Sequence, residues 1–265
     1  MTALSHTLAG DGVRIAYRFD GDAAKPVLML SNSIGTSLHM WDAQIPALTR
    51  HFRVLRYDLR GHGGSGVADG AYSLDRLGRD ALELLDALGI ERVHFLGLSL
   101  GGMVGQWLGV HAPERIERLI LSNTSAYLGP AGQWDERIAA VLQAPDMGET
   151  AEMFLRNWFP ESMLHGDSAA VREFRAMLLA TPQRGLAGNY AAVRDMDLRR
   201  VIALIPLPTL VIAGEFDTVT AASHSEAIAA TIPGAKLLSL PVVHLSNVEF
   251  GEAFERAVIE FLLPA

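Results

Sequence analysis

The chain has 265 residues, of which 49% are hydrophobic and 20% are charged, so it can bury a large core without metals or disulfides. It contains no cysteine, which excludes cysteine nucleophiles, thiolate metal sites and disulfide frameworks. The formal net charge is −8 and the sequence has no basic stripe, which argues against a nucleic-acid partner.

The N-terminal segment lacks the basic start and apolar block of a secretory signal. No apolar run reaches the roughly 20 residues that cross a bilayer. We therefore expect a cytoplasmic protein without a membrane partner. The histidines lack the paired spacing of a metal site, so we expect neither a metal nor another cofactor. The sequence does not indicate an oligomeric state.

Apolar segments rich in β-branched residues alternate with helical patterns, which predicts an α/β fold on a mainly parallel sheet. The middle segments are continuous apolar runs, as expected of strands that helices cover on both faces. The predicted strands span residues 13–19, 27–31, 54–58, 93–98, 119–123, 209–213 and 236–240.

The helix predicted between the third and fourth of these strands is marked at both ends. Apolar residues recur at a spacing near 3.6 from Leu74 to Leu88. Ser73 precedes them as a suitable N-cap, and Gly89 follows where a left-handed glycine commonly ends a helix. Further helices are predicted at residues 99–111 and 249–262.

The stretch 126–205 shows no strand pattern. Three prolines divide it into short helical pieces: Pro145, Pro160 and Pro182. We predict that this stretch is a helical cap inserted over one end of the sheet. Residues 1–125 and 206–265 would then form the core domain.

The motif Gly97-Leu98-Ser99-Leu100-Gly101 joins a predicted strand to a predicted helix. A G-x-S-x-G sequence in this setting is typical of a nucleophile elbow, where small neighbours allow a strained serine to stand above the sheet. The following helix N-terminus favours developing negative charge. Ser99 is therefore our candidate nucleophile; the alternative is an N-cap serine flanked by chance glycines.

A serine hydroxyl needs a base, and on this fold the acid and the histidine follow the serine in that order. Asp217 follows the strand at 209–213, and His244 follows the strand at 236–240. Glu215 is the competing acid and His224 the competing histidine. His244 would take the Ser99 proton while Asp217 orients the imidazole, so activity should fall on the acid side of neutrality, where imidazoles become protonated.

The oxyanion hole needs two backbone donors. One is expected from the residue after the nucleophile, the Leu100 N–H. The other is expected from the loop after the strand at 27–31, where we assign the Ile34 N–H. The alternative for this loop is a simple turn between a strand and a helix. His62, in the segment RGHGGSG, is interpreted as a loop-shaping residue rather than a catalyst.

In these features the sequence resembles the α/β hydrolases across nearly its whole length, and more narrowly the 3-oxoadipate enol-lactonases. The matching stretches are LSNSIGTSLHMWDAQ, LRGHGGS and GLSLGGMVGQWLG. Many members of the wider superfamily carry His-Gly in the oxyanion loop, whereas this chain carries Asn32-Ser33, which is similar to the enol-lactonase group. The resemblance implies an α/β-hydrolase fold with helices on both faces of the sheet and an inserted cap.

The resemblance also implies a substrate, the enol-lactone of 3-oxoadipate, which is a small ring bearing a carboxylate. A buried carboxylate needs a partner. Arg137 lies about one helical turn after Trp134, so the two side chains can share a face. We expect Arg137 to bind the carboxylate and Trp134 to wall the ring; the alternative is a solvated surface arginine.

Other functions use the same motifs. A general carboxylesterase or a carbon–carbon bond hydrolase would share the Ser99, Asp217 and His244 set, and only substrate profiling separates them. Dehalogenases and epoxide hydrolases on this fold use an aspartate at the elbow, which Ser99 argues against. A ligand receptor that kept a hydrolase pocket is the alternative outside enzymology.

Overall fold

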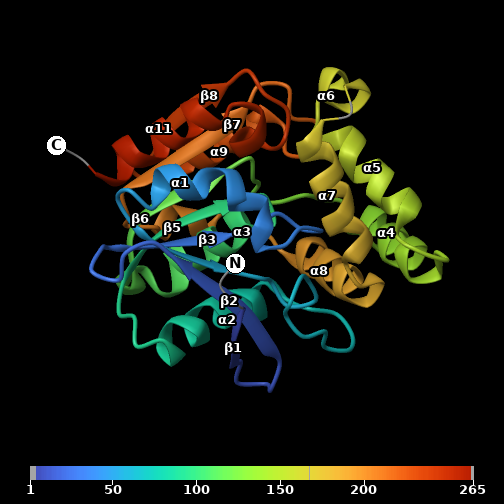
Figure 1. Ribbon diagram of the computed structural model, residues 1–265, viewed down its shortest axis with the longest axis horizontal. Coiled ribbons are helices and arrows are strands. Elements are labelled where there is room, and N and C mark those ends of the chain that lie inside the picture. Colours follow the sequence, from blue (N-terminus) through green and yellow to red (C-terminus); the bar gives the residue numbers. More distant parts are fainter. Residues whose placement is uncertain (1–3, 167, 264–265) are drawn as a thin grey trace.

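The computed structural model describes residues 4–166 and 168–263 of the chain. Within them, one eight-stranded sheet has the order β1-β2-β4-β3-β5-β6-β7-β8 (Figure 1). β1 and β2 pair antiparallel, as do β2 and β4, and every other neighbouring pair is parallel. The strands are β1 (Ser5–Leu8), β2 (Arg14–Asp20), β3 (Val27–Ser31), β4 (Arg53–Tyr57), β5 (Val93–Leu98), β6 (Ile116–Ser122), β7 (Thr209–Gly214) and β8 (Lys236–Leu240).

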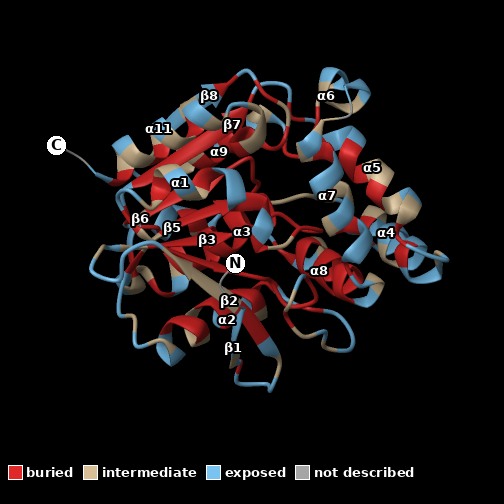
Figure 2. Ribbon diagram, in the orientation of Figure 1, coloured by how far each residue is buried: buried red, intermediate tan, exposed pale blue. Residues whose placement is uncertain are grey.

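The predicted α/β fold with a mainly parallel sheet is confirmed, with two corrections at the level of strands. β1 was not predicted, because this strand is only four residues long, is mostly exposed and contains no apolar run. The strand predicted at 119–123 begins earlier and ends at Ser122, because Asn123 has a left-handed φ of 45° that takes it out of the strand. The inner strands are buried, as the continuous apolar runs indicate (Figure 2).

Helices cover the sheet in two layers. α2 (Leu74–Ala87) packs against α3 (Leu100–His111), and both α3 and α9 (Ala222–Thr231) contact the short helix η3 (Val201–Leu204). α11 (Gly251–Leu262) packs in the other layer against three short elements. These are η1 (Leu38–Gln44), α1 (Ile45–Leu48) and α10 (Ser246–Glu249). The short helix η2 (Pro113–Arg115) precedes β6.

The end signals of α2 are confirmed. The Ser73 side chain accepts a hydrogen bond from the Arg76 N–H, and Gly89 has a left-handed φ of 64°. The helix predicted at 249–262 is α11, which begins two residues later, at Gly251. Phe250 separates it from the short helix α10, because its φ of −130° and ψ of 47° are not helical backbone.

In the described ranges, five α-helices lie between β6 and β7 and gather beside one end of the sheet, to the right in Figure 1. We call them the cap helices. They are α4 (Ala131–Gln143), α5 (Gly148–Trp158), α6 (Glu161–His165), α7 (Ala169–Ala180) and α8 (Gln183–Asp195). Pro145 lies between α4 and α5, and Pro160 and Pro182 directly precede α6 and α8. The division into domains at residues 125/126 and 205/206 stays a prediction.

In the part of the chain that the structure describes, none of the helices combines the length and the apolar character that crossing a membrane requires.

Candidate active site

Ser99 lies at a sharp turn between β5 and α3. Its φ of 58° and ψ of −117° are strained for a residue with a side chain. Its backbone is fixed from both sides, since the Ser99 N–H donates to Ser122 O at 3.0 Å and Thr124 Oγ1 donates to Ser99 O at 2.7 Å. The side chain forms no N-cap hydrogen bond, so the capping alternative for this serine is not supported.

The glycines of the motif are required by close backbone packing. A Cβ added at Gly97 would lie 2.1 Å from Gly101 O, and one added at Gly101 would lie 2.1 Å from Ser31 O. Neither contact could be relieved by rotating a side chain, because the atoms that collide belong to the backbone. The elbow therefore needs both small residues.

Asp217 and His244 meet in a buried pair at the same edge of the sheet. Asp217 follows β7 and His244 follows β8, and His244 Nδ1 lies 2.8 Å from Asp217 Oδ2. Both side chains are inaccessible to solvent. Because a carboxylate only accepts, Nδ1 is the protonated nitrogen of the neutral ring and Nε2 carries the lone pair.

The Asp217 carboxylate is supported as an anion. Its Oδ1 accepts from the Val219 and Thr220 N–H groups at 2.8 and 2.9 Å, and its Oδ2 also accepts from Thr220 Oγ1 at 2.9 Å. Burial alone would raise the pKa of Asp217, but the His244 imidazole and these hydrogen bonds outweigh it and lower the pKa.

The two competing residues lie elsewhere. Glu215 is exposed, and within residues 4–166 and 168–263 its carboxylate forms no hydrogen bond or ion pair. His224 places its Nδ1 3.0 Å from Ser125 Oγ rather than against an acid. The geometry therefore brings together Asp217 and His244, the pair expected from the chain order.

Ser99 shares this edge with the pair. In the sheet, β6 lies between β5, which precedes Ser99, and β7, which precedes Asp217. Asn123 directly follows β6 and donates through Nδ2 to Asp217 Oδ2 at 3.3 Å and to Val243 O at 3.2 Å. Among the described residues, His244 Nε2 is buried without a hydrogen-bond partner, so no bond joins it to the Ser99 hydroxyl. A hydrogen bond between a catalytic base and its nucleophile often forms only when substrate binds.

A hydrogen bond joins the two segments that carry the expected oxyanion donors. The Gly101 N–H donates to Asn32 O at 3.0 Å, which ties the start of α3 to the loop that carries Ile34. Within the described ranges, neither the Ile34 N–H nor the Leu100 N–H has a protein acceptor. Thr36 donates through its N–H and its hydroxyl to Ser33 O. Ser33 C=O and Ile34 N–H belong to the same peptide, and in a trans peptide these two groups point in opposite directions. The bonds to Ser33 O therefore fix the direction of the Ile34 N–H.

Trp134 and Arg137 share a face of α4, as the spacing predicts. The Arg137 guanidinium carbon lies 4.7 Å from the centre of the Trp134 ring, and both residues line a cavity of about 260 Å³. Thr218 and Val219, which directly follow Asp217, form another part of its wall. A wider groove of about 480 Å³ runs between η1 and α7, but its lining includes no residue of the Asp217–His244 pair or its immediate neighbours.

Three side chains of the site were not found from the sequence: Trp158, Asn123 and Thr220. Trp158 lines the same cavity, and its ring stacks on His244 with 6.4 Å between centroids and 18° between planes. Asn123 supports Asp217 as described above. Thr220 could have been found, because an aspartate followed three residues later by threonine is a common side-chain-bonded turn.

A profile of the family described as "alpha/beta hydrolase fold" matches residues 26–158. The 3-oxoadipate enol-lactonase 2 of Acinetobacter baylyi is 36% identical over 252 residues, which cover 95% of this chain and 94% of that protein. The chain belongs to the α/β-hydrolase family. This confirms both the resemblance and the fold class predicted from the sequence.

Two solved structures of α/β hydrolases are similar over almost the full length. The crystal structure of a hydrolase from Pseudomonas aeruginosa PA01 is 69% identical, covers 98% of both chains and superposes with a TM-score of 0.97. The enol-lactonase from Burkholderia xenovorans is 36% identical, covers 97% of this chain and 99% of its own, and has a TM-score of 0.94. This chain is therefore a hydrolase by family.

Proposed function

We propose that this chain is a serine hydrolase that opens the ring of 3-oxoadipate enol-lactone to give 3-oxoadipate. The observation that carries the proposal is the buried Asp217–His244 pair, which leaves a free Nε2 lone pair at the same sheet edge as the strained Ser99 elbow. The choice of substrate is supported by the relatives named as enol-lactonases at 36% identity.

The reaction begins with attack of the Ser99 hydroxyl oxygen on the lactone carbonyl, while the hydroxyl proton passes to His244 Nε2. Asp217 keeps the imidazole oriented and stabilises its positive charge. The negative charge on the former carbonyl oxygen is met by the free N–H groups of Ile34 and Leu100. Loss of one such donor typically costs about 2.7–4 kcal/mol of transition-state stabilisation.

Ring opening then breaks the C–O bond and leaves an acyl-enzyme that still carries the enolate. An enolate is a better leaving group than an ordinary alkoxide, so proton donation by His244 matters less in this step. The protonated His244 gives its proton to the enolate, which becomes the ketone, so the imidazole is neutral again. Water then attacks the Ser99 ester while His244 Nε2 takes a proton from it. Collapse of this intermediate breaks the bond to Ser99 Oγ, returns the proton from His244 to the serine and releases 3-oxoadipate.

The substrate carboxylate would be held by Arg137, which lines the cavity. Arg137 is exposed, and in the described part of the chain it forms no ion pair with a carboxylate, so its guanidinium is available to an anionic ligand. The aromatic wall includes Trp134 and Trp158, which suits a small flat ring. The volume of about 260 Å³ lies just below the range of roughly 300–1,000 Å³ typical of pockets for drug-sized ligands.

The test is to compare kcat/KM for the enol-lactone with kcat/KM for 4-nitrophenyl acetate, a neutral ester. We expect the lactone to be preferred by about 10- to 100-fold, the size of one charge-assisted contact. Asp217→Asn should lower kcat by roughly 10⁴, because the imidazole loses its orientation, while Glu215→Gln should leave kcat unchanged. Equal or better hydrolysis of the neutral ester would indicate a general carboxylesterase instead.

A further inference from the structure

A buried histidine accepts a hydrogen bond from Gly35, the residue after the expected oxyanion donor Ile34. The Gly35 N–H donates to His62 Nε2 at 2.8 Å, and the His62 side chain is inaccessible to solvent. Gly35 has a left-handed φ of 77°, and a Cβ added to it would lie 2.8 Å from Leu178 Cδ2 of α7. The oxyanion loop is thus confined between His62 and the cap helices.

This contact determines the protonation state of His62. A backbone N–H can only donate, so Nε2 must be the acceptor and must carry a lone pair. The proton of the neutral ring is therefore on Nδ1, which faces Arg60 O at 3.3 Å. A protonated ring would direct a second N–H at the Gly35 N–H and lose the bond.

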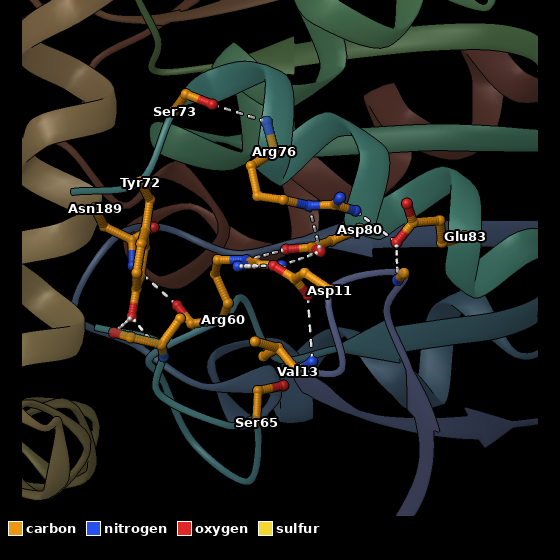
Figure 3. A network of polar contacts seen from close by, with 12 residues as sticks. Asp11, Val13, Arg60, Ser65, Tyr72, Ser73, Arg76, Asp80, Glu83 and Asn189 are labelled. Atoms are coloured by element: carbon orange, nitrogen blue, oxygen red, sulfur yellow. Dashed lines mark hydrogen bonds and ion pairs between the residues drawn. The ribbon is translucent and has the colours of Figure 1, made fainter. Parts of the chain in front are cut away.

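The loop that carries His62 is itself seated on the cap helix α8. Asn189 Nδ2 donates to Arg60 O and to Gly185 O, both at 2.9 Å, and Asn189 projects from α8 toward Arg60 (Figure 3). A Cβ added at Gly185 would lie 2.1 Å from Gly61 O. The backbones of the loop and of α8 are therefore in direct contact, and the loop cannot shift without α8.

We propose that His62 is a positioning residue that couples the seating of α8 to the geometry of the oxyanion hole. The route runs from Asn189 to the Arg60 carbonyl, from there to the His62 ring, and from Nε2 to the peptide that joins Ile34 and Gly35. The inference rests on the proposed function, since it requires the Ile34 N–H to act on the oxyanion. A displacement of about 1 Å in such a site can cost about 100-fold in rate.

Three variants test the route: His62→Phe, which removes the acceptor; His62→Gln, which can restore it through Oε1; and Asn189→Ala, which removes the donor on α8. The readouts are kcat per active site, titrated with a fluorophosphonate, and KM for 4-nitrophenyl acetate. We expect His62→Phe to lower kcat by about 10- to 100-fold with KM changed less than about threefold, and His62→Gln to stay within about threefold of the parent.

The double variant His62→Phe/Asn189→Ala tests the coupling itself. Residues on one route do not act additively, so the double variant should lose little more than His62→Phe alone. His94→Phe and Asn247→Ala are the matched controls, because both change part-buried or buried side chains without touching this route. Both controls should leave kcat per titrated site unchanged.

Three results would overturn the proposal: an unchanged kcat per titrated site in His62→Phe, a His62→Gln variant as slow as His62→Phe, or additive losses in the double variant. If His62→Phe does not fold, kcat per site in Asn189→Ala decides in its place: a loss supports the route and parent-like turnover overturns it.

Ser99→Ala separates the two proposals. If that variant keeps its esterase activity, the proposed function fails as well; if it is inactive while the His62 variants behave like the controls, only the positioning role fails.

Discussion

The amide of Asn123, which directly follows the neighbouring strand β6, supports the carboxylate of Asp217, with 3.3 Å between Nδ2 and Oδ2. Its orientation is fixed, because Asn123 Oδ1 accepts from the hydroxyls of Ser122 and Ser246, each at 2.7 Å. Asn123 is also one of only two non-glycine residues in the described ranges with a left-handed φ; the other is Ser99. Local strain of this kind is common at functional sites.

Replacing Asn123 by alanine should therefore lower both activity and stability. The Asp217 carboxylate would lose one donor and two buried hydroxyls would lose their acceptor, so we expect kcat/KM to fall about 3- to 10-fold and the free energy of unfolding to fall by about 1–3 kcal/mol. Steady-state kinetics and urea unfolding measure the two effects. Asn247→Ala, which removes a buried amide that does not contact Asp217, should lose stability and keep kcat/KM.

Replacing Arg137 by alanine should act on the charged substrate alone. With the enol-lactone we expect KM to rise about 10- to 100-fold, because a charge-assisted contact to the carboxylate is lost. With 4-nitrophenyl acetate the change should stay within about threefold. The measurement is KM for both substrates, and equal losses on the two would remove the carboxylate-binding role from Arg137.

A buried ion pair, Arg60–Asp80, should stabilise the fold without taking part in catalysis. Asp80 receives hydrogen bonds from Arg60 Nε and Nη2 at 2.5 and 2.6 Å, and both side chains are 2% exposed (Figure 3). In Asp80→Asn the buried Arg60 keeps only the partly exposed Asp11 as an anionic partner, so the substitution should cost about 3 kcal/mol of unfolding free energy. The control Asp75→Asn removes an exposed ion pair with Arg79 on the same helix and should cost less than about 0.5 kcal/mol. Similar costs for both, measured by urea unfolding, would contradict this account.

Protonation of His62 should make the fold sensitive to acid. Burial lowers the pKa of His62 from 6.5 to about 4, so between these values the unfolded chain binds more protons than the folded one. Stability is therefore lost as pH falls from about 6.5 to about 4, by about 3 kcal/mol for this group. We expect the unfolding free energy of the parent minus that of His62→Gln, measured at several pH values, to fall by that amount between pH 6.5 and pH 4. A constant difference across the window would show that His62 is not the group involved.

The arrangement of the site along the chain could be predicted because it depends on topology. Parallel strands place their carboxyl ends at one edge, so residues that follow β5, β7 and β8 had to meet there. The glycines of the elbow also carried a local signal, since only a strained turn needs them. The same holds for Ser73 and Gly89 at the ends of α2.

The supporting contacts could not be predicted, because they join elements that no local pattern relates. Asn123 reaches Asp217 across 94 positions of sequence, and His62 reaches Gly35 across 27. The stacking of Trp158 on His244 depends on how the cap helices pack over the sheet. The sequence pattern identified His62 only as a loop-shaping residue, and the structure adds which loop it shapes.

The most direct test of the account is the rate and site of labelling by a fluorophosphonate, read by intact mass and peptide mapping. We predict one label per chain on Ser99, a parallel loss of enol-lactone hydrolysis as the label accumulates, and labelling at least about 1,000-fold slower in His244→Ala. Labelling at another residue, or a labelling rate that is unaffected by the loss of His244, would contradict the proposed mechanism.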